Sequence, residues 1–209
     1  MTDSPPGAKA IRIALHAAGI KFEDKHVVYG EYQELKKTTS DHGWKHGLPV
    51  LEVGGVRVTQ SLAHLRYAGK KSGLYPTDDL QALRVDEVLD ICQDVLTDLT
   101  KTPHADDEAE KLAKRAEYTA GKMAGYMSLL AQRADENAAA VRGPWLVGAE
   151  MTIADLGVYI ALLGMIRAGD FDGVPKDYTD AWPALAALEA AVPEHAIVSG
   201  YYKDFPRDD

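Results

Sequence analysis

The sequence contains only one cysteine, Cys92, among its 209 residues. A single thiol cannot form an internal disulfide, so the cysteine content gives no sign of an oxidising compartment. Long apolar runs are also missing, because no stretch approaches the roughly 18 residues that a membrane helix needs. The opening stretch, MTDSPPGAKA, lacks the apolar core of a signal peptide. We therefore expect a cytoplasmic protein without a membrane partner.

Positive charge is scarce as well. Lys and Arg together number 23 against 32 Asp and Glu, which gives a net charge of -9. Nucleic acid is not expected as a partner, because phosphate binding needs a basic surface. With 46% hydrophobic and 26% charged residues, the chain has enough apolar side chains to form a buried core.

The first part of the chain mixes helical and strand patterns. Apolar residues recur at helical spacing from Ile11 to Ile20 and again along SLAHLRYAGKKSG. The stretch KFEDKHVVYG has the pattern of a short strand, and LPVLEV and VRVTQ form a predicted hairpin around Gly54-Gly55. After LYPTDDLQ the strand patterns stop, and helices are predicted over residues 78–105, residues 107–140, MTIADLGVYIALLGMI and AWPALAALEAAV. We expect an α+β protein with a small mixed domain over residues 1–75 and an all-helical domain over residues 78–209.

Two polar residues, Gln60 and Ser61, stand where the predicted hairpin ends and a helix begins. A helix N-terminus has unpaired N–H groups and a partial positive charge, so it binds carboxylates or phosphates. The Ser61 hydroxyl and the Gln60 amide can add charge-assisted hydrogen bonds to such an anion. The alternative is that Ser61 only caps the helix.

Two further pairs of residues can be interpreted either as ligand contacts or as ordinary structural residues. If the Leu48-Pro49 bond is cis, the Leu48 backbone is left free to pair with a peptide; a trans proline would merely open the strand. Tyr32 and Lys36 share one face if EYQELK is helical, where the lysine can meet a carboxylate. The alternative is an ordinary solvated helix.

Together these motifs resemble a glutathione transferase of the sigma class and its mu, alpha and pi relatives. The resemblance is carried by LPVLEV followed by VTQSLAHLRY, by IRIALHAAGIKFED, and by PWLVGAEMTIADL, in which Thr152 and Asp155 have the spacing of a capping box. It implies a thioredoxin-like domain followed by a helical bundle, and a homodimer that uses glutathione as co-substrate without another cofactor. The glutathione contacts that it implies are Tyr32, Lys36, Trp44, Lys45, Leu48, Pro49, Gln60, Ser61 and, from the partner subunit, Asp94.

The sequence departs from the family pattern at its beginning. The family's first strand carries a tyrosine that activates the glutathione thiol, but that position falls at about Met1, and no tyrosine precedes Tyr29. Three explanations stay open: a lost first strand, another catalytic hydroxyl such as Ser4, or a fold retained without the chemistry. A lost central strand would expose core surface, so we expect compensation by the terminus or by dimer contacts.

The leading hypothesis is a glutathione transferase that acts on an apolar electrophile. The second substrate is expected between the domains, against Leu96, Thr100, Lys101 and His104. One alternative is a non-catalytic protein of this fold that binds an apolar ligand or another protein, and another is a structural subunit that needs only the dimer interface. Cys92 is expected in the core, and no metal site is expected at His42 and His46, because the glycines between and after them disfavour a regular helix.

Overall fold

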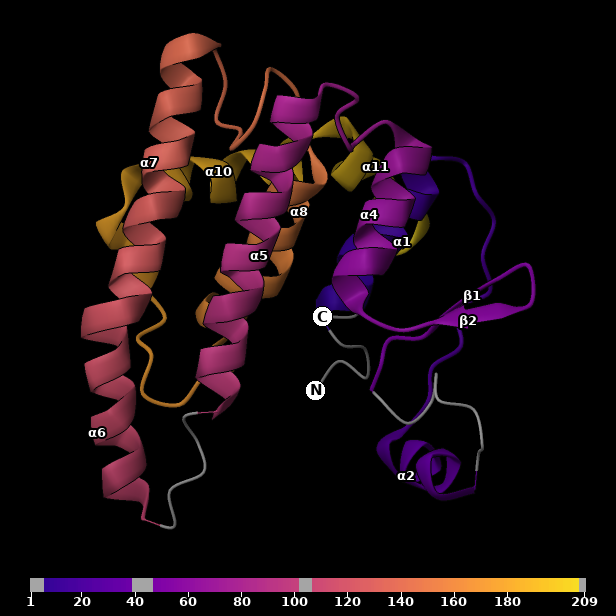
Figure 1. The fold of residues 1–209 in the computed structure, drawn as a ribbon, viewed down its shortest axis with the longest axis horizontal. Helices are drawn as coiled ribbons and strands as arrows, with labels where there is room; N and C mark the ends of the chain where they lie inside the picture. Colours follow the sequence, from indigo (N-terminus) through magenta and orange to yellow (C-terminus); the bar gives the residue numbers. More distant parts are fainter. Residues whose placement is uncertain (1–5, 39–46, 102–106, 207–209) are drawn as a thin grey trace.

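The computed structural model describes residues 6–38, 47–101 and 107–206, and Figure 1 shows their arrangement. Helices α6 and α7 follow one another end to end on one side of the molecule with α5 beside them, and α1, α4 and a β-hairpin lie on the other side. The elements of the first part are α1 (Pro6–Ala17), α2 (Tyr29–Thr38), β1 (Leu51–Val53), β2 (Val56–Val58) and α4 (Ser61–Ser72). The α+β fold class is therefore confirmed.

Helix α1 forms where the apolar spacing predicts it, although it begins earlier than expected, at Pro6. Proline suits the first position of a helix, because its missing N–H would have no partner there. Ile13 and Ala14 are completely buried, and α1 packs most extensively against α4. Gly19 has a φ of 65° and closes the exit from the helix, as predicted.

The hairpin has the predicted turn but shorter strands. Leu51 pairs with Val58, and Val53 pairs with Val56, in antiparallel register around Gly54 and Gly55. The φ values of the two glycines, 58° and 79°, lie in the left-handed region, which other residues adopt only at an energetic cost. Val53, Val56 and Val58 are all exposed, so the hairpin itself buries little apolar surface.

The prediction of a strand in KFEDKHVVYG is wrong. Residues 21–28 form no regular element, and β1 and β2 are the only strands among the residues that the structure describes. A strand forms only when its N–H and C=O groups find a neighbouring strand. In the described part of the chain, none lies beside this segment.

The second part is helical, as predicted, and each long helical pattern forms. Its elements are α5 (Asp79–Lys101), α6 (Glu108–Tyr118), the π-helical turn η1 (Thr119–Met123), α7 (Ala124–Ala140), α8 (Ile153–Gly157), the π-helical turn η2 (Val158–Leu163), α9 (Gly164–Ala168), the 3-10 turn η3 (Tyr178–Ala181), α10 (Pro183–Glu194) and α11 (Ala196–Asp204). The sequence patterns did not predict α11. None of these helices, nor any other in the described ranges, is both long and apolar enough to span a membrane.

The predicted capping box fixes the start of α8. The Thr152 hydroxyl accepts from the Ala154 N–H, and the Asp155 carboxylate accepts from the Thr152 N–H at 2.7 Å. Asp155 also accepts from the Leu146 N–H at 2.8 Å, so it joins the PWLVG loop to the helix. Met151 and Leu156, which flank the capping box in the positions of a hydrophobic staple, are both buried.

A single apolar core joins the two parts of the chain. Ile13 and Leu65 belong to the same buried cluster as Leu89 and Ile153. The contact is close: a Cβ on Gly69 of α4 would lie 2.6 Å from Ile153 Cγ2. Because this core crosses the loop between α4 and α5, the domain division between residues 75 and 78 stays a prediction.

Candidate functional site

Helix α4 begins at Ser61, at the predicted junction. Gln60 precedes it in a left-handed conformation with a φ of 77°, and its side chain makes no capping hydrogen bond. The first bond of the helix runs from the His64 N–H to the Gln60 carbonyl at 3.1 Å. The N–H groups of the first turn are therefore not used inside the helix. Capping by Gln60 does not account for this junction, and Ser61 stands inside the first turn rather than at the cap position.

The N-terminus of α1 meets the N-terminus of α4 at this point. A Cβ placed on Gly7 would lie 3.2 Å from Ser61 Cβ and 3.3 Å from its Oγ. Each helix start has a partial positive charge of about half an elementary charge. Two such charges converge beside one hydroxyl, and an anion placed there would be stabilised by both.

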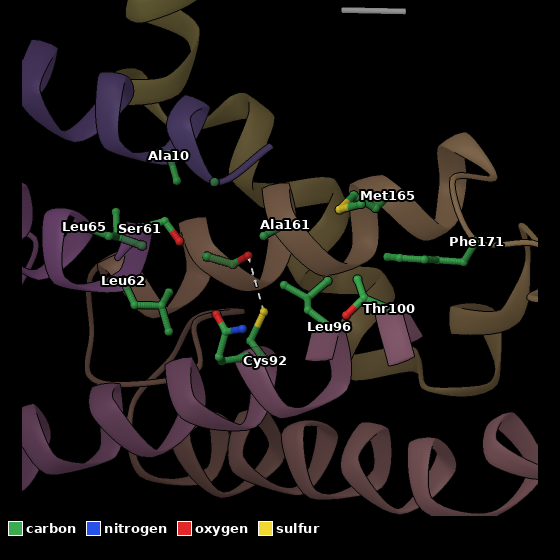
Figure 2. Close-up of a pocket in the computed structure, with 13 residues that line it drawn as sticks. Ala10, Ser61, Leu62, Leu65, Cys92, Leu96, Thr100, Ala161, Met165 and Phe171 are labelled. Carbon is green, nitrogen blue, oxygen red and sulfur yellow. Dashed lines mark hydrogen bonds between the residues drawn. The ribbon is translucent and has the colours of Figure 1, made fainter. Parts of the chain in front are cut away.

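An apolar cavity of about 210 Å³ opens beside Ser61, between the two parts of the chain (Figure 2). Ser61 and Leu62 stand at one end of it, and Met165 and Phe171 stand at the other. The remaining lining residues are Gly7, Ala10, Leu65, Cys92, Gln93, Leu96, Thr100, Gly157 and Ala161. Such a cavity suits an apolar group, and its polar edge at Ser61 can orient a charged one.

Cys92 lies in the wall of this cavity, in the buried position that the sequence predicts. The exposed fraction of Cys92 is only 1%. Its Sγ donates a hydrogen bond to the Gly157 carbonyl oxygen at 3.9 Å. Burial raises the pKa of the Cys92 thiol to about 12. A thiol with such a pKa stays protonated at neutral pH and is a poor nucleophile.

The structure brings some of the other predicted site residues together and separates others. Leu96 and Thr100 line the cavity with Ser61, whereas Lys101 is exposed at the end of α5 and does not line it. The Leu48-Pro49 bond is cis, but both residues line a separate groove beside the hairpin. Ser4, Trp44, Lys45 and His104 lie outside the described residues, as do His42 and His46.

Tyr32 and Lys36 share one face of α2, as predicted. The Lys36 ammonium lies 5.4 Å from the centre of the Tyr32 ring, a distance at which a cation–π interaction forms. Helix α2 lies away from α1 and α4, beyond the hairpin (Figure 1), and neither residue lines the cavity. Asp94 is exposed on α5, where its carboxylate accepts a 3.2 Å hydrogen bond from the Tyr126 hydroxyl.

Met165 and Phe171 are cavity residues that the sequence analysis did not identify. Met165 belongs to an apolar helical pattern in which pocket residues and core residues look alike, whereas Phe171 follows α9 in a loop. The one available signal for Phe171 was its place in the sequence GDFDG, where a phenylalanine stands between acidic residues and glycines.

Comparisons with known proteins agree with this geometry. A family model described as glutathione S-transferase, C-terminal domain, matches residues 93–204, and one described as glutathione S-transferase, N-terminal domain, matches residues 4–70. The chain is 26% identical over 199 residues to S-crystallin SL11 of Nototodarus sloanii, covering 94% of this chain and 90% of that protein. It is 29% identical over 157 residues to glutathione S-transferase 2 of Manduca sexta, covering 74% and 73%.

The solved structures give the same assignment of the fold. A sigma class glutathione transferase of Fasciola hepatica superposes with a TM-score of 0.77 at 21% identity, covering 98% of this chain and 94% of that one. At that identity the likeness is evidence for the fold alone. The C-terminal family model, however, matches more than half of the 209 residues. The chain therefore belongs to the glutathione S-transferase family.

Proposed function

We propose that this protein joins the sulfur of glutathione to an apolar electrophile. The observation that carries the proposal is the meeting of two helix N-termini at Ser61, beside an apolar cavity. Glutathione presents carboxylates, which are anions at neutral pH, and a thiol, which becomes an anion when it loses its proton to react. A site with converging positive helix ends and an adjacent apolar space suits both substrates at once.

In this proposal the γ-glutamyl carboxylate of glutathione binds at the start of α4. The free N–H groups of the first turn, the Ser61 hydroxyl and the Gln60 amide donate to it. The Leu48 backbone beside Pro49 pairs with the cysteinyl unit, and Tyr32 and Lys36, with Trp44 and Lys45, approach the glycyl carboxylate. Asp94 of the partner subunit in a homodimer would pair with the γ-glutamyl ammonium.

The thiolate of glutathione is the reactive form, because it attacks as a nucleophile and the thiol does not. The positive end of α1 stabilises this thiolate and lowers its pKa. The sulfur then forms a bond with the electrophilic carbon, whose leaving group departs with the bonding electron pair, and the thiol proton passes to solvent. Ser4 remains the candidate for a hydroxyl that assists the sulfur.

The second substrate is proposed to lie in the cavity, against Leu96, Thr100, Met165 and Phe171. Apolar side chains dominate the lining, so the preferred substrate is uncharged and largely hydrocarbon. Cys92 shares this wall without competing for the electrophile, because its thiol stays protonated.

The test combines calorimetry with a conjugation assay using a chloronitrobenzene. We expect the Gln60→Ala/Ser61→Ala variant to lose glutathione uptake by calorimetry and to lose conjugation in parallel. The matched control is Gln132→Ala/Ser199→Ala, which removes the same residue types from the helical part and should change neither. Unchanged glutathione uptake by the first variant would show that the α4 terminus is not the carboxylate site.

A second candidate function is ligand binding without catalysis. The likeness to S-crystallin SL11, a relative that is not named as an enzyme, supports this candidate. A protein that gains thermal stability with glutathione but conjugates nothing would have this role, because a ligand that binds only the native state stabilises it. A dimer with no response to glutathione would instead be a structural subunit. The homodimer and the cytoplasmic location belong to the proposal, and light scattering and cell fractionation test them.

A further inference from the structure

Arg115 of α6 is a buried charge with few partners. Its exposed fraction is 2%, and its Nη2 donates a hydrogen bond to the Leu99 carbonyl oxygen at 2.7 Å. Its Nε and Nη1 are buried and find no acceptor in the described part of the chain. A buried charge in this state costs free energy, and apolar residues of similar volume often give equal or higher stability. A contribution to stability therefore does not account for this arginine.

The hydrogen bond of Arg115 fixes the end of α5. Leu99 belongs to the last turn of this helix, where the carbonyl groups have no N–H partner inside the helix. A cation at a helix C-terminus also interacts favourably with the negative end of the helix dipole. The next residue, Thr100, lines the cavity beside Ser61. Arg115 therefore anchors the part of α5 that forms one side of the cavity.

The same face of α6 holds the turn that contains Phe171. Lys111 and Arg115 are four residues apart and share this face. The Lys111 ammonium lies 2.6 Å from the Asp172 carboxylate, and a Cβ placed on Gly173 would lie only 3.0 Å from Arg115 Cγ. Phe171 is buried, and its side chain points into the cavity at the end far from α4 (Figure 2). It is thus attached to α6 through the two residues that follow it.

We propose that Lys111 and Arg115 are positioning residues that set the length of the apolar substrate. Through their contacts, Thr100 stays in the wall of the cavity and Phe171 stays at its far end. A rigid end excludes chains that extend past it, whereas a loosened end admits them. The inference rests on the proposed function, because it assumes that the electrophile lies in this cavity of about 210 Å³.

The probes are nitrobenzenes that bear unbranched alkyl chains of increasing length, from ethyl to octyl. They lack the chlorine leaving group, so calorimetry on the full chain measures their binding without any reaction. We expect the affinity to fall by about tenfold or more between the longest chain that fits and the next one. The Arg115→Met variant retains a packed side chain but loses the donor to Leu99, and this fall should shrink to about twofold. Arg115→Lys keeps a charged donor and should restore most of it.

Asp172→Ala tests the other contact of α6. It removes an ion pair at the protein surface, where such pairs contribute little to stability, so the variant should fold and show the same loss of discrimination. It decides the question if Arg115→Met does not fold. The matched controls are Glu110→Ala, which breaks the pair with Lys114 on the same helix, and Arg133→Met, which removes a paired arginine on α7. Both controls should keep the native fall in affinity.

Two further measurements separate positioning from a merely structural role. In Arg115→Met, hydrogen exchange should be faster at residues 97–101 and 171–174 and unchanged in α10, while the unfolding free energy should not fall. The proposal is overturned if no probe binds, if the native protein binds all chain lengths equally, or if either folded variant keeps the native fall in affinity. Conjugation of a chloronitrobenzene is measured on the same samples. Its absence while the unreactive probes still bind would refute the proposed function and leave the role of α6 standing.

Discussion

Replacing Asp155 with alanine should destabilise the protein more than any surface change. The Asp155 side chain is completely buried and accepts hydrogen bonds from the Leu146 N–H at 2.8 Å, the Thr152 N–H at 2.7 Å and the Thr152 hydroxyl at 3.0 Å. Alanine leaves all three donors without this acceptor. The two backbone N–H groups are buried with their residues, so water does not easily replace the carboxylate.

The size of the effect follows from these two backbone groups. A buried donor left unsatisfied costs about 1–3 kcal/mol, so the pair gives a loss of roughly 2–6 kcal/mol in the free energy of unfolding. A domain typically has roughly 5–15 kcal/mol in total, so the variant is expected to be marginally stable. Asp155→Asn keeps one acceptor oxygen and should fall between the alanine variant and the native protein.

Urea denaturation followed by circular dichroism at pH 7.5 measures this loss. Asp135, which is exposed on α7, supplies the control variant Asp135→Ala, and its change should stay within about 0.5 kcal/mol. If Asp155→Ala proves as stable as that control, the capping box does not hold α8, and the hydrogen bonds described above have no net value.

Three further predictions concern the domain contact, the cavity and a buried histidine. Gly69→Ala should cost about 1–3 kcal/mol, because its Cβ would lie 2.6 Å from Ile153 Cγ2, while Gly30→Ala, with nothing within 4 Å, should cost less; equal losses in urea titrations would contradict this. Ala161→Phe should fill the cavity and raise KM for a chloronitrobenzene by about tenfold, without changing the affinity for glutathione. The control Ala63→Phe, on the exposed side of α4, should change neither quantity. Burial lowers the pKa of His64, although its 2.8 Å hydrogen bond with the Val58 carbonyl opposes the shift. As the pH falls below about 6.5, this histidine is therefore protonated more readily in the unfolded chain than in the folded protein. Between pH 7 and 5 the wild-type protein should therefore lose more unfolding free energy than the His64→Gln variant. Equal losses in the two proteins would refute this.

Local patterns in the sequence were enough to locate much of the fold. The glycines at 54 and 55 select one kind of hairpin turn, and the capping box at Thr152 and Asp155 sets a helix start, because each is determined within a few residues. The junction at Ser61 was predicted for the same reason. A helix N-terminus is a local event, and its unpaired N–H groups follow from helix geometry alone.

Features that depend on distant parts of the chain could not be read in this way. Phe22 and Val28 have the composition of a strand, but a strand also needs a neighbour, and the described residues supply none. Met165 and Phe171 line the same cavity as Ser61, at its opposite end, only after α4, α5 and the later helices pack together. Before packing, their apolar character predicts burial and nothing about a cavity.

Helix α1 links the two hollows of the molecule. Gly7 and Ala10 line the cavity beside Ser61, while Ala8 and Ile11 line the groove beside the hairpin. These pairs interleave along the sequence, so they lie on different faces of the same helical turns. In the proposed mechanism, the position of α1 therefore sets how closely the two helix starts converge on the thiolate of glutathione.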